Sequence, residues 1–85
     1  MNETEFLKQF VEIYSPTGNT SRAAPFLLHQ MQKLGFHTEI DSHGNVLAAF
    51  EKPIPRNPKL LFCGHYDTVP GKIPVRIEGN QLYGR

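Results

Sequence analysis

Apolar side chains in the first residues of the chain recur at the spacing of one face of a helix. The pattern covers about residues 3–14, and its apolar positions fall three or four residues apart. Asn2 stands before it as a cap, with Glu5 three residues on, which is the arrangement of a capping box. Ser15-Pro16 follows, and a residue before proline avoids the helical region. We therefore predict an amphipathic helix whose apolar face joins a core.

A second helical pattern follows, and its apolar stripe continues to about Leu34. Asn19 or Thr20 can cap this helix, and Gly35 stands where a left-handed C-cap belongs. Pro25 is compatible with a helix that begins there, because the first turn does not need its missing N–H. The stripe predicts a second amphipathic helix.

Shorter apolar stretches in the next part of the chain predict a hairpin. Residues 36–40 and 46–50 are strand candidates, and Asp41-Ser42-His43-Gly44-Asn45 between them has the composition of a turn. Near Asp41 lie His37 and His43, which raise the alternative of a metal cluster. We interpret them as turn residues beside an edge strand, because such a loop accounts for the same polar side chains.

The remaining patterns predict one buried strand and a last hairpin. Leu60 to Cys63 is an uninterrupted apolar run, which is typical of a strand buried on both faces. Residues 73–78 and 81–83 flank Gly79-Asn80, a two-residue hairpin signal. The order of two helices followed by strands predicts an α/β fold, with a mixed sheet that ends in a hairpin.

Polar side chains follow the predicted buried strand at once. Gly64 ends the apolar run, and His65 and Asp67 come next with one residue between them. In extended backbone such residues point to the same side. A histidine oriented by a carboxylate is a common metal ligand, whereas a strand end with a histidine satisfied by Asp67 is the structural alternative. The pattern alone leaves both interpretations open.

Composition removes several classes of function. The 85 residues suffice for one small domain, and a net charge of +1 without a basic stripe argues against nucleic-acid binding. No apolar segment approaches the roughly 20 residues of a membrane span, and the N-terminus lacks the features of a secretory signal. Cys63 is the single cysteine, so no internal disulfide can form. We expect a cytoplasmic protein in which Cys63 is a buried apolar residue.

Two segments resemble a known enzyme family. Residues 61–71, Leu-Phe-Cys-Gly-His-Tyr-Asp-Thr-Val-Pro-Gly, resemble the first metal-binding motif of the dinuclear zinc exopeptidases and amidohydrolases, such as acetylornithine deacetylase and succinyl-diaminopimelate desuccinylase. Leu82-Tyr83-Gly84-Arg85 resembles the opening of that family's second motif. A weaker likeness extends upstream through Ser15-Pro16-Thr17-Gly18. The resemblance implies the N-terminal part of a three-layer α/β/α catalytic domain, spanning residues 1–85 with no second domain.

The resemblance also implies a chemistry and a division of roles. His65 would bind one of two divalent metal ions, zinc or cobalt, and Asp67 would orient His65 without binding metal itself. The other ligands and the general base would lie beyond Arg85. We therefore expect a metal-dependent amide hydrolase in which the 85-residue chain alone is inactive, since a zinc site takes at least three protein ligands.

The short segment Lys72–Glu78 points to a substrate class. It resembles the corresponding loop of the hydrolases that release lysine or ornithine from an amino-group carrier protein in biosynthesis. The expected partner is thus a carrier protein or a small N-acyl amino acid. An exopeptidase of the same family and a non-catalytic, self-associating module remain the alternatives. Because the predicted sheet is unfinished, we also expect homo-oligomers.

Overall fold

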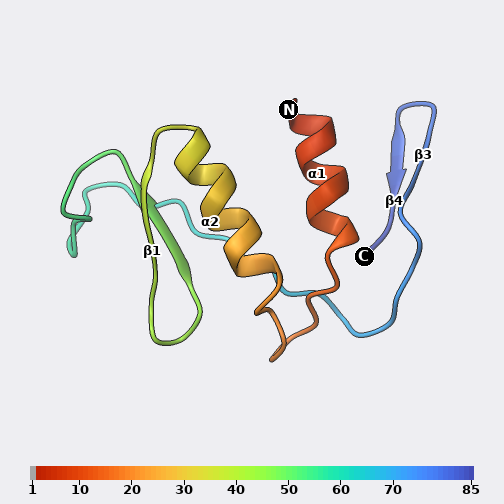
Figure 1. Ribbon diagram of the computed structural model, residues 1–85, viewed down its shortest axis with the longest axis horizontal. Coiled ribbons are helices and arrows are strands. Elements are labelled where there is room, and N and C mark those ends of the chain that lie inside the picture. Colours follow the sequence, from red (N-terminus) through yellow and green to blue (C-terminus); the bar gives the residue numbers. More distant parts are fainter. Residues whose placement is uncertain (1) are drawn as a thin grey trace. The chain divides into compact units, whose positions relative to one another are not determined.

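A computed structural model describes residues 2–85. Its helices and strands, labelled in Figure 1, are α1 (Glu3–Glu12), α2 (Ala23–Lys33), β1 (His37–Ile40), β2 (Val46–Ala49), β3 (Arg76–Glu78) and β4 (Gln81–Tyr83). The chain divides into two compact units. The first unit comprises residues 2–23 and 66–85, and the second comprises residues 24–65.

Helix α1 confirms the predicted start and ends earlier than expected. The Glu5 backbone N–H donates to Asn2 Oδ1 at 2.8 Å, so Asn2 caps the helix as predicted. Ile13 already has extended backbone angles, and the helix therefore stops at Glu12, two residues before the predicted end at Tyr14. The expectation of a buried apolar face is wrong, because no residue of α1 is buried.

Helix α2 begins at Ala23, three residues after the nearer of the two predicted caps. Pro25 therefore lies in the first turn, where its missing N–H leaves no helical bond unmade. The predicted C-terminus is confirmed: Gly35 has a φ of 96°, and its N–H donates to the Gln32 carbonyl at 3.0 Å. The Phe36 N–H donates to the Met31 carbonyl at 3.1 Å, which completes a Schellman motif. No helix of residues 2–85 has the length and apolar character that crossing a membrane requires.

The predicted hairpin of the second unit is confirmed in type, with slightly shorter strands. β1 and β2 pair antiparallel, with Ile40 opposite Val46. Asp41 organises the turn: its Oδ1 accepts from the backbone N–H groups of His43 and Asn45, both at 2.9 Å, and its Oδ2 accepts from Asn45 Nδ2 at 2.9 Å. The interpretation of this region as a turn is therefore confirmed.

The C-terminal hairpin is also confirmed, but it forms a sheet of its own. β3 and β4 pair antiparallel around Gly79-Asn80, and Gly79 takes a positive φ of 61°. The Arg76 guanidinium lies 4.2 Å from the ring centre of Tyr83, directly across the hairpin. The predicted mixed sheet is wrong: among residues 2–85 the strands form two separate antiparallel pairs. The coarser prediction of an α/β chain is confirmed.

The segment Leu60 to Cys63 departs most from expectation. It is not a strand, and Leu60, Leu61 and Phe62 are 73%, 70% and 89% exposed. Cys63 is exposed as well, so its predicted burial is wrong. A strand buried on both faces needs strands at its edges and cover above and below. All four strands within residues 2–85 are used in the two hairpins, so this segment has no strand beside it.

Little of the described chain is buried. Among residues 2–85 only Ser15, Pro16, Ala23 and Ala24 are buried, and no large side chain is fully enclosed. Small side chains bury little apolar area, and burial stabilises by only about 25 cal/mol per Å². Residues 2–85 therefore gain little stability from a hydrophobic core of their own.

The turn of the first hairpin yields a prediction about pH. The pKa of Asp41 is lowered from its ordinary value of 3.8, chiefly by the hydrogen bond from the Asn45 side chain and then by its backbone N–H. A carboxyl group whose pKa is lower in the folded than in the unfolded protein stabilises the fold at pH values above its unfolded pKa. This stabilisation is lost as the pH falls through the folded pKa. We expect Asn45→Ala to raise the pKa of Asp41, as measured by NMR titration. Ser42→Ala is the matched control, and an unchanged pKa in Asn45→Ala would contradict the cause given.

The exposed apolar segment yields a prediction about association. We expect a polypeptide limited to residues 1–85 to form dimers or larger oligomers, because exposed apolar surface and unpaired edges favour pairing with another copy. Light scattering on the purified polypeptide measures its mass. Leu61→Lys with Phe62→Lys should shift it toward monomer, and Lys52→Glu with Lys59→Glu is a control outside the apolar run. A wild-type polypeptide that is monomeric at high concentration would refute the expectation.

Candidate functional site

The segment Tyr66 to Thr68, which contains Asp67, is paired with the loop that follows α1. The Thr68 N–H donates to the Ser15 carbonyl at 2.8 Å, and the Thr17 N–H donates to the Thr68 carbonyl at 3.1 Å. Pro16 and Thr68 thereby form a parallel bridge. Two backbone bonds thus fix the position of the residue that follows Asp67 within the first unit.

Two hydroxyl groups of the same loop add side-chain bonds. Ser15, which is 3% exposed, donates its hydroxyl to the Tyr66 carbonyl at 2.9 Å. Thr17 donates its hydroxyl to Asp67 Oδ2 at 2.6 Å. That separation lies in the range of charge-assisted O–H···O⁻ bonds. The Asp67 carboxylate is therefore held by a side chain that lies 50 residues away in the sequence.

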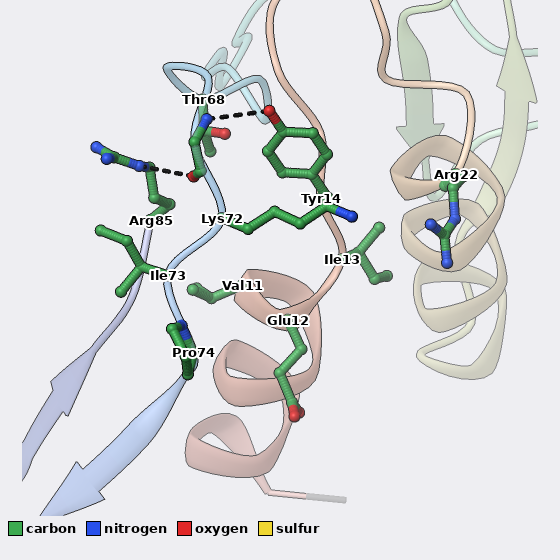
Figure 2. Close-up of a pocket in the computed structure, with 11 residues that line it drawn as sticks. Val11, Glu12, Ile13, Tyr14, Arg22, Thr68, Lys72, Ile73, Pro74 and Arg85 are labelled. Carbon is green, nitrogen blue, oxygen red and sulfur yellow. Dashed lines mark hydrogen bonds between the residues drawn. The ribbon is translucent and has the colours of Figure 1, made fainter.

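The turn that follows Thr68 is held by two hydrogen bonds, one to the N–H and one to the carbonyl of Gly71. The Gly71 N–H donates to the Tyr14 hydroxyl at 3.0 Å, and Arg85 Nε donates to the Gly71 carbonyl at 2.9 Å, as the dashed lines in Figure 2 show. Gly71 has a φ of 112°, a backbone conformation that other residues rarely adopt. The loop after α1, through Tyr14, and the end of the described chain, through Arg85, thus meet at the close of the first motif.

An open pocket of about 380 Å³ lies beside this turn, within the first unit. Its lining includes three cationic side chains: Arg22, Lys72 and Arg85. In Figure 2 their charged ends lie apart and point to different sides. Arg85 Nε is bound to the Gly71 carbonyl, and the Lys72 amine lies 5.4 Å from the centre of the Tyr14 ring. The cations therefore do not converge as an anion-binding site would require.

The two predicted site residues have different surroundings. His65 is exposed and is the last residue of the second unit, whereas Asp67 is partly buried in the first. Within residues 2–85 no three histidine, cysteine or acidic side chains gather as a metal site. His65 has the chemistry of a single zinc ligand, and a catalytic zinc site needs at least three from the protein. The residues described here fit a metal site in part.

The sequence patterns did not predict four of the contacts around Asp67 and Gly71, which involve Tyr14, Ser15, Thr17 and Arg85. Ser15-Pro16-Thr17-Gly18 and Leu82-Tyr83-Gly84-Arg85 had been noted for their likeness to a family. That likeness was the available signal that these segments belong near the first motif.

Comparison with known proteins gives close relatives over almost the whole chain. The chain is 49% identical over 81 residues to a protein of Pyrococcus abyssi and 46% identical over 83 residues to one of Thermococcus kodakarensis, both named as LysW-lysine/LysW-ornithine hydrolases. It is 40% identical over 82 residues to the LysW-lysine hydrolase of Deinococcus radiodurans. These matches cover 95%, 98% and 95% of the chain.

The chain spans only 23%, 23% and 22% of the length of these three relatives. No protein-family model matches it. The resemblance to lysine- and ornithine-releasing hydrolases, drawn from the segment Lys72–Glu78, is confirmed, because homologues at 46–49% identity carry the name LysW-lysine/LysW-ornithine hydrolase.

The packing of the second motif yields a prediction. A side chain at position 84 would place its Cβ 2.6 Å from Val11 Cγ1 on α1 and 3.2 Å from Val75 Cγ2. We expect Gly84→Ala to destabilise the protein by about 1–3 kcal/mol, since overpacking displaces neighbours. Chemical denaturation of the protein that contains this chain measures the change. Gly64→Ala is the control, because nothing lies within 4 Å of its Cβ. Equal stability of the two variants would contradict the close approach.

Proposed function

We propose that this chain is part of an enzyme that cleaves an amide bond to release lysine or ornithine from a small carrier protein. The chain is homologous to the LysW-lysine and LysW-ornithine hydrolases and spans 22–24% of their length. The observation that carries the proposal is the sequence match, which extends over at least 95% of the chain in these relatives. The short segment Lys72–Glu78, which resembles the loop of carrier-protein hydrolases, supports the same substrate class.

The exposed apolar run supports a larger catalytic domain. Leu60 and Leu61 lie next to each other, so in a strand they would face opposite sides, and both are largely exposed within residues 2–85. A three-layer α/β/α domain would cover both faces of such a strand with helices. We propose that Leu60 to Cys63 becomes an interior strand of that domain and that His65 follows its end, which is where ligands bind in α/β sheets.

His65 and Asp67 would hold and orient one metal ion. His65 would bind it through one ring nitrogen, while Asp67 would accept a hydrogen bond from the other and so fix the tautomer. Divalent ions, zinc or cobalt, would supply activation of a water molecule and polarisation of the amide carbonyl. The remaining ligands and the general base would come from outside residues 1–85.

The proposed roles predict the effect of two substitutions in the protein that contains this chain. His65→Ala should abolish nearly all hydrolysis, because the metal loses a direct ligand. Asp67→Ala should lower activity by about 10–100-fold, as is usual for residues that orient a ligand. The measurement is release of lysine from a carrier-protein conjugate, with N-acetyl-lysine as the competing substrate.

His29→Ala is the matched control, because His29 is exposed on α2. Wild-type turnover by a His65→Ala enzyme of measured metal content would refute the metal assignment. Faster hydrolysis of N-acetyl-lysine than of the conjugate would leave the amide chemistry in place and refute the carrier-protein substrate.

The same reasoning predicts weak metal binding by residues 1–85 alone. One histidine cannot build a zinc site, so a calorimetric titration with Zn²⁺ should show no defined stoichiometry. A single tight site per chain would contradict the assignment of the missing ligands to other parts of the protein.

A further inference from the structure

We propose that Thr17 is a positioning residue that holds the Asp67 carboxylate in the orientation needed to align His65. The inference rests on the proposed function and extends it to a segment far from the motif. It is carried by the bond of 2.6 Å that the Thr17 hydroxyl donates to Asp67 Oδ2.

The bond leaves Asp67 able to serve a second partner. An ionised carboxylate has two oxygens with about four acceptor sites, so one hydroxyl on Oδ2 does not exhaust it. Thr17 fixes the rotation of the carboxylate about its last bond. A bond from an imidazole to the same group would then have a defined direction, which is what an orienting carboxylate requires.

The backbone around Thr17 makes this contact more than a chance approach of two side chains. The Thr17 N–H donates a hydrogen bond to the Thr68 carbonyl, and the Thr68 N–H donates one to the Ser15 carbonyl. The Ser15 hydroxyl is bonded to the carbonyl of Tyr66. The loop therefore holds both neighbours of Asp67, and the Thr17 hydroxyl reaches the side chain between them.

The loop itself is built to stay in place. Ser15 and Pro16 are buried, and Pro16 has a fixed φ that limits the freedom of the segment. Gly18 has a φ of 83° and turns the chain away directly after Thr17. A threonine in this position loses little further freedom when it bonds Asp67, because β-branched side chains already have few rotamers.

A positioning role and a merely structural role predict different results. If Thr17 only ties the loop together, its loss lowers stability and leaves metal affinity per folded molecule unchanged. If Thr17 orients Asp67, its loss weakens metal binding and turnover while the affinity for the carrier protein stays the same. The hydroxyl is the group that matters, so serine should replace threonine and valine should not.

The experiment compares Thr17→Val and Thr17→Ser in the protein that contains this chain. Zn²⁺ affinity is measured by competition with a chromophoric chelator, alongside kcat, KM and the melting temperature. We expect Thr17→Val to weaken Zn²⁺ binding and lower kcat by about fivefold, which is below the roughly 10–100-fold for a residue that orients a ligand directly. KM for the carrier conjugate should not change, and Thr17→Ser should stay within about twofold of wild type.

Thr20→Val is the matched control, since Thr20 lies in the same loop and its backbone carbonyl accepts from the Ala23 N–H. It should keep wild-type Zn²⁺ affinity. Thr17→Ser losses as large as those of Thr17→Val, or wild-type Zn²⁺ affinity in Thr17→Val, would overturn the inference.

A double-mutant cycle with Asp67→Asn tests whether Thr17 acts through Asp67. In the Asp67→Asn protein, Thr17→Val should cause little further loss of Zn²⁺ affinity, because residues that act as one unit are not additive. Equal losses in both backgrounds would overturn the inference. Normal activity and Zn²⁺ affinity in the Asp67→Asn protein itself would refute the orienting role of Asp67 and with it the inference about Thr17, whereas a wild-type protein that releases no lysine from the conjugate would refute the proposed function.

Discussion

The pairing of the loop after α1 with the segment around Asp67 holds the first unit together. It joins residues 50 positions apart, so it has to offset the entropy of closing a long loop, which is about 3.5 kcal/mol plus a constant. Two backbone bonds and two hydroxyl bonds span the contact. At about 0.5–1.5 kcal/mol each, they contribute roughly 2–6 kcal/mol together. The four bonds are comparable with the cost of closure, so each of them matters.

The features that could be predicted from the sequence are those whose cause lies within a few residues. Asn2 caps α1 because its side chain reaches the Glu5 N–H, and Gly35 ends α2 because it can take a positive φ. Both hairpins formed around their turn residues for the same reason. Asp41 bonds its own neighbours, and nothing distant is needed to place it. Local chemistry decided these elements.

The predictions that failed concern features that depend on distant neighbours. Leu60 to Cys63 has the composition of an interior strand, but no strand within residues 2–85 lies beside it to accept its backbone bonds. The candidate site shows the same division. His65 and Asp67 were found from a motif of three positions. Thr17 was not assigned a role, because its spacing from Asp67 follows no local period and only the fold brings the two together.

We propose that the loop at Ser15–Thr17 holds Asp67, which in turn orients His65 toward a metal ion. Anomalous scattering at the zinc edge, from crystals of the protein that contains this chain, tests it most directly. We expect a zinc peak about 2.0–2.1 Å from a ring nitrogen of His65. The other ring nitrogen should donate a hydrogen bond to Asp67, and the Thr17 hydroxyl should donate one to the same carboxylate. A fully occupied zinc site that does not include His65 would contradict the claim.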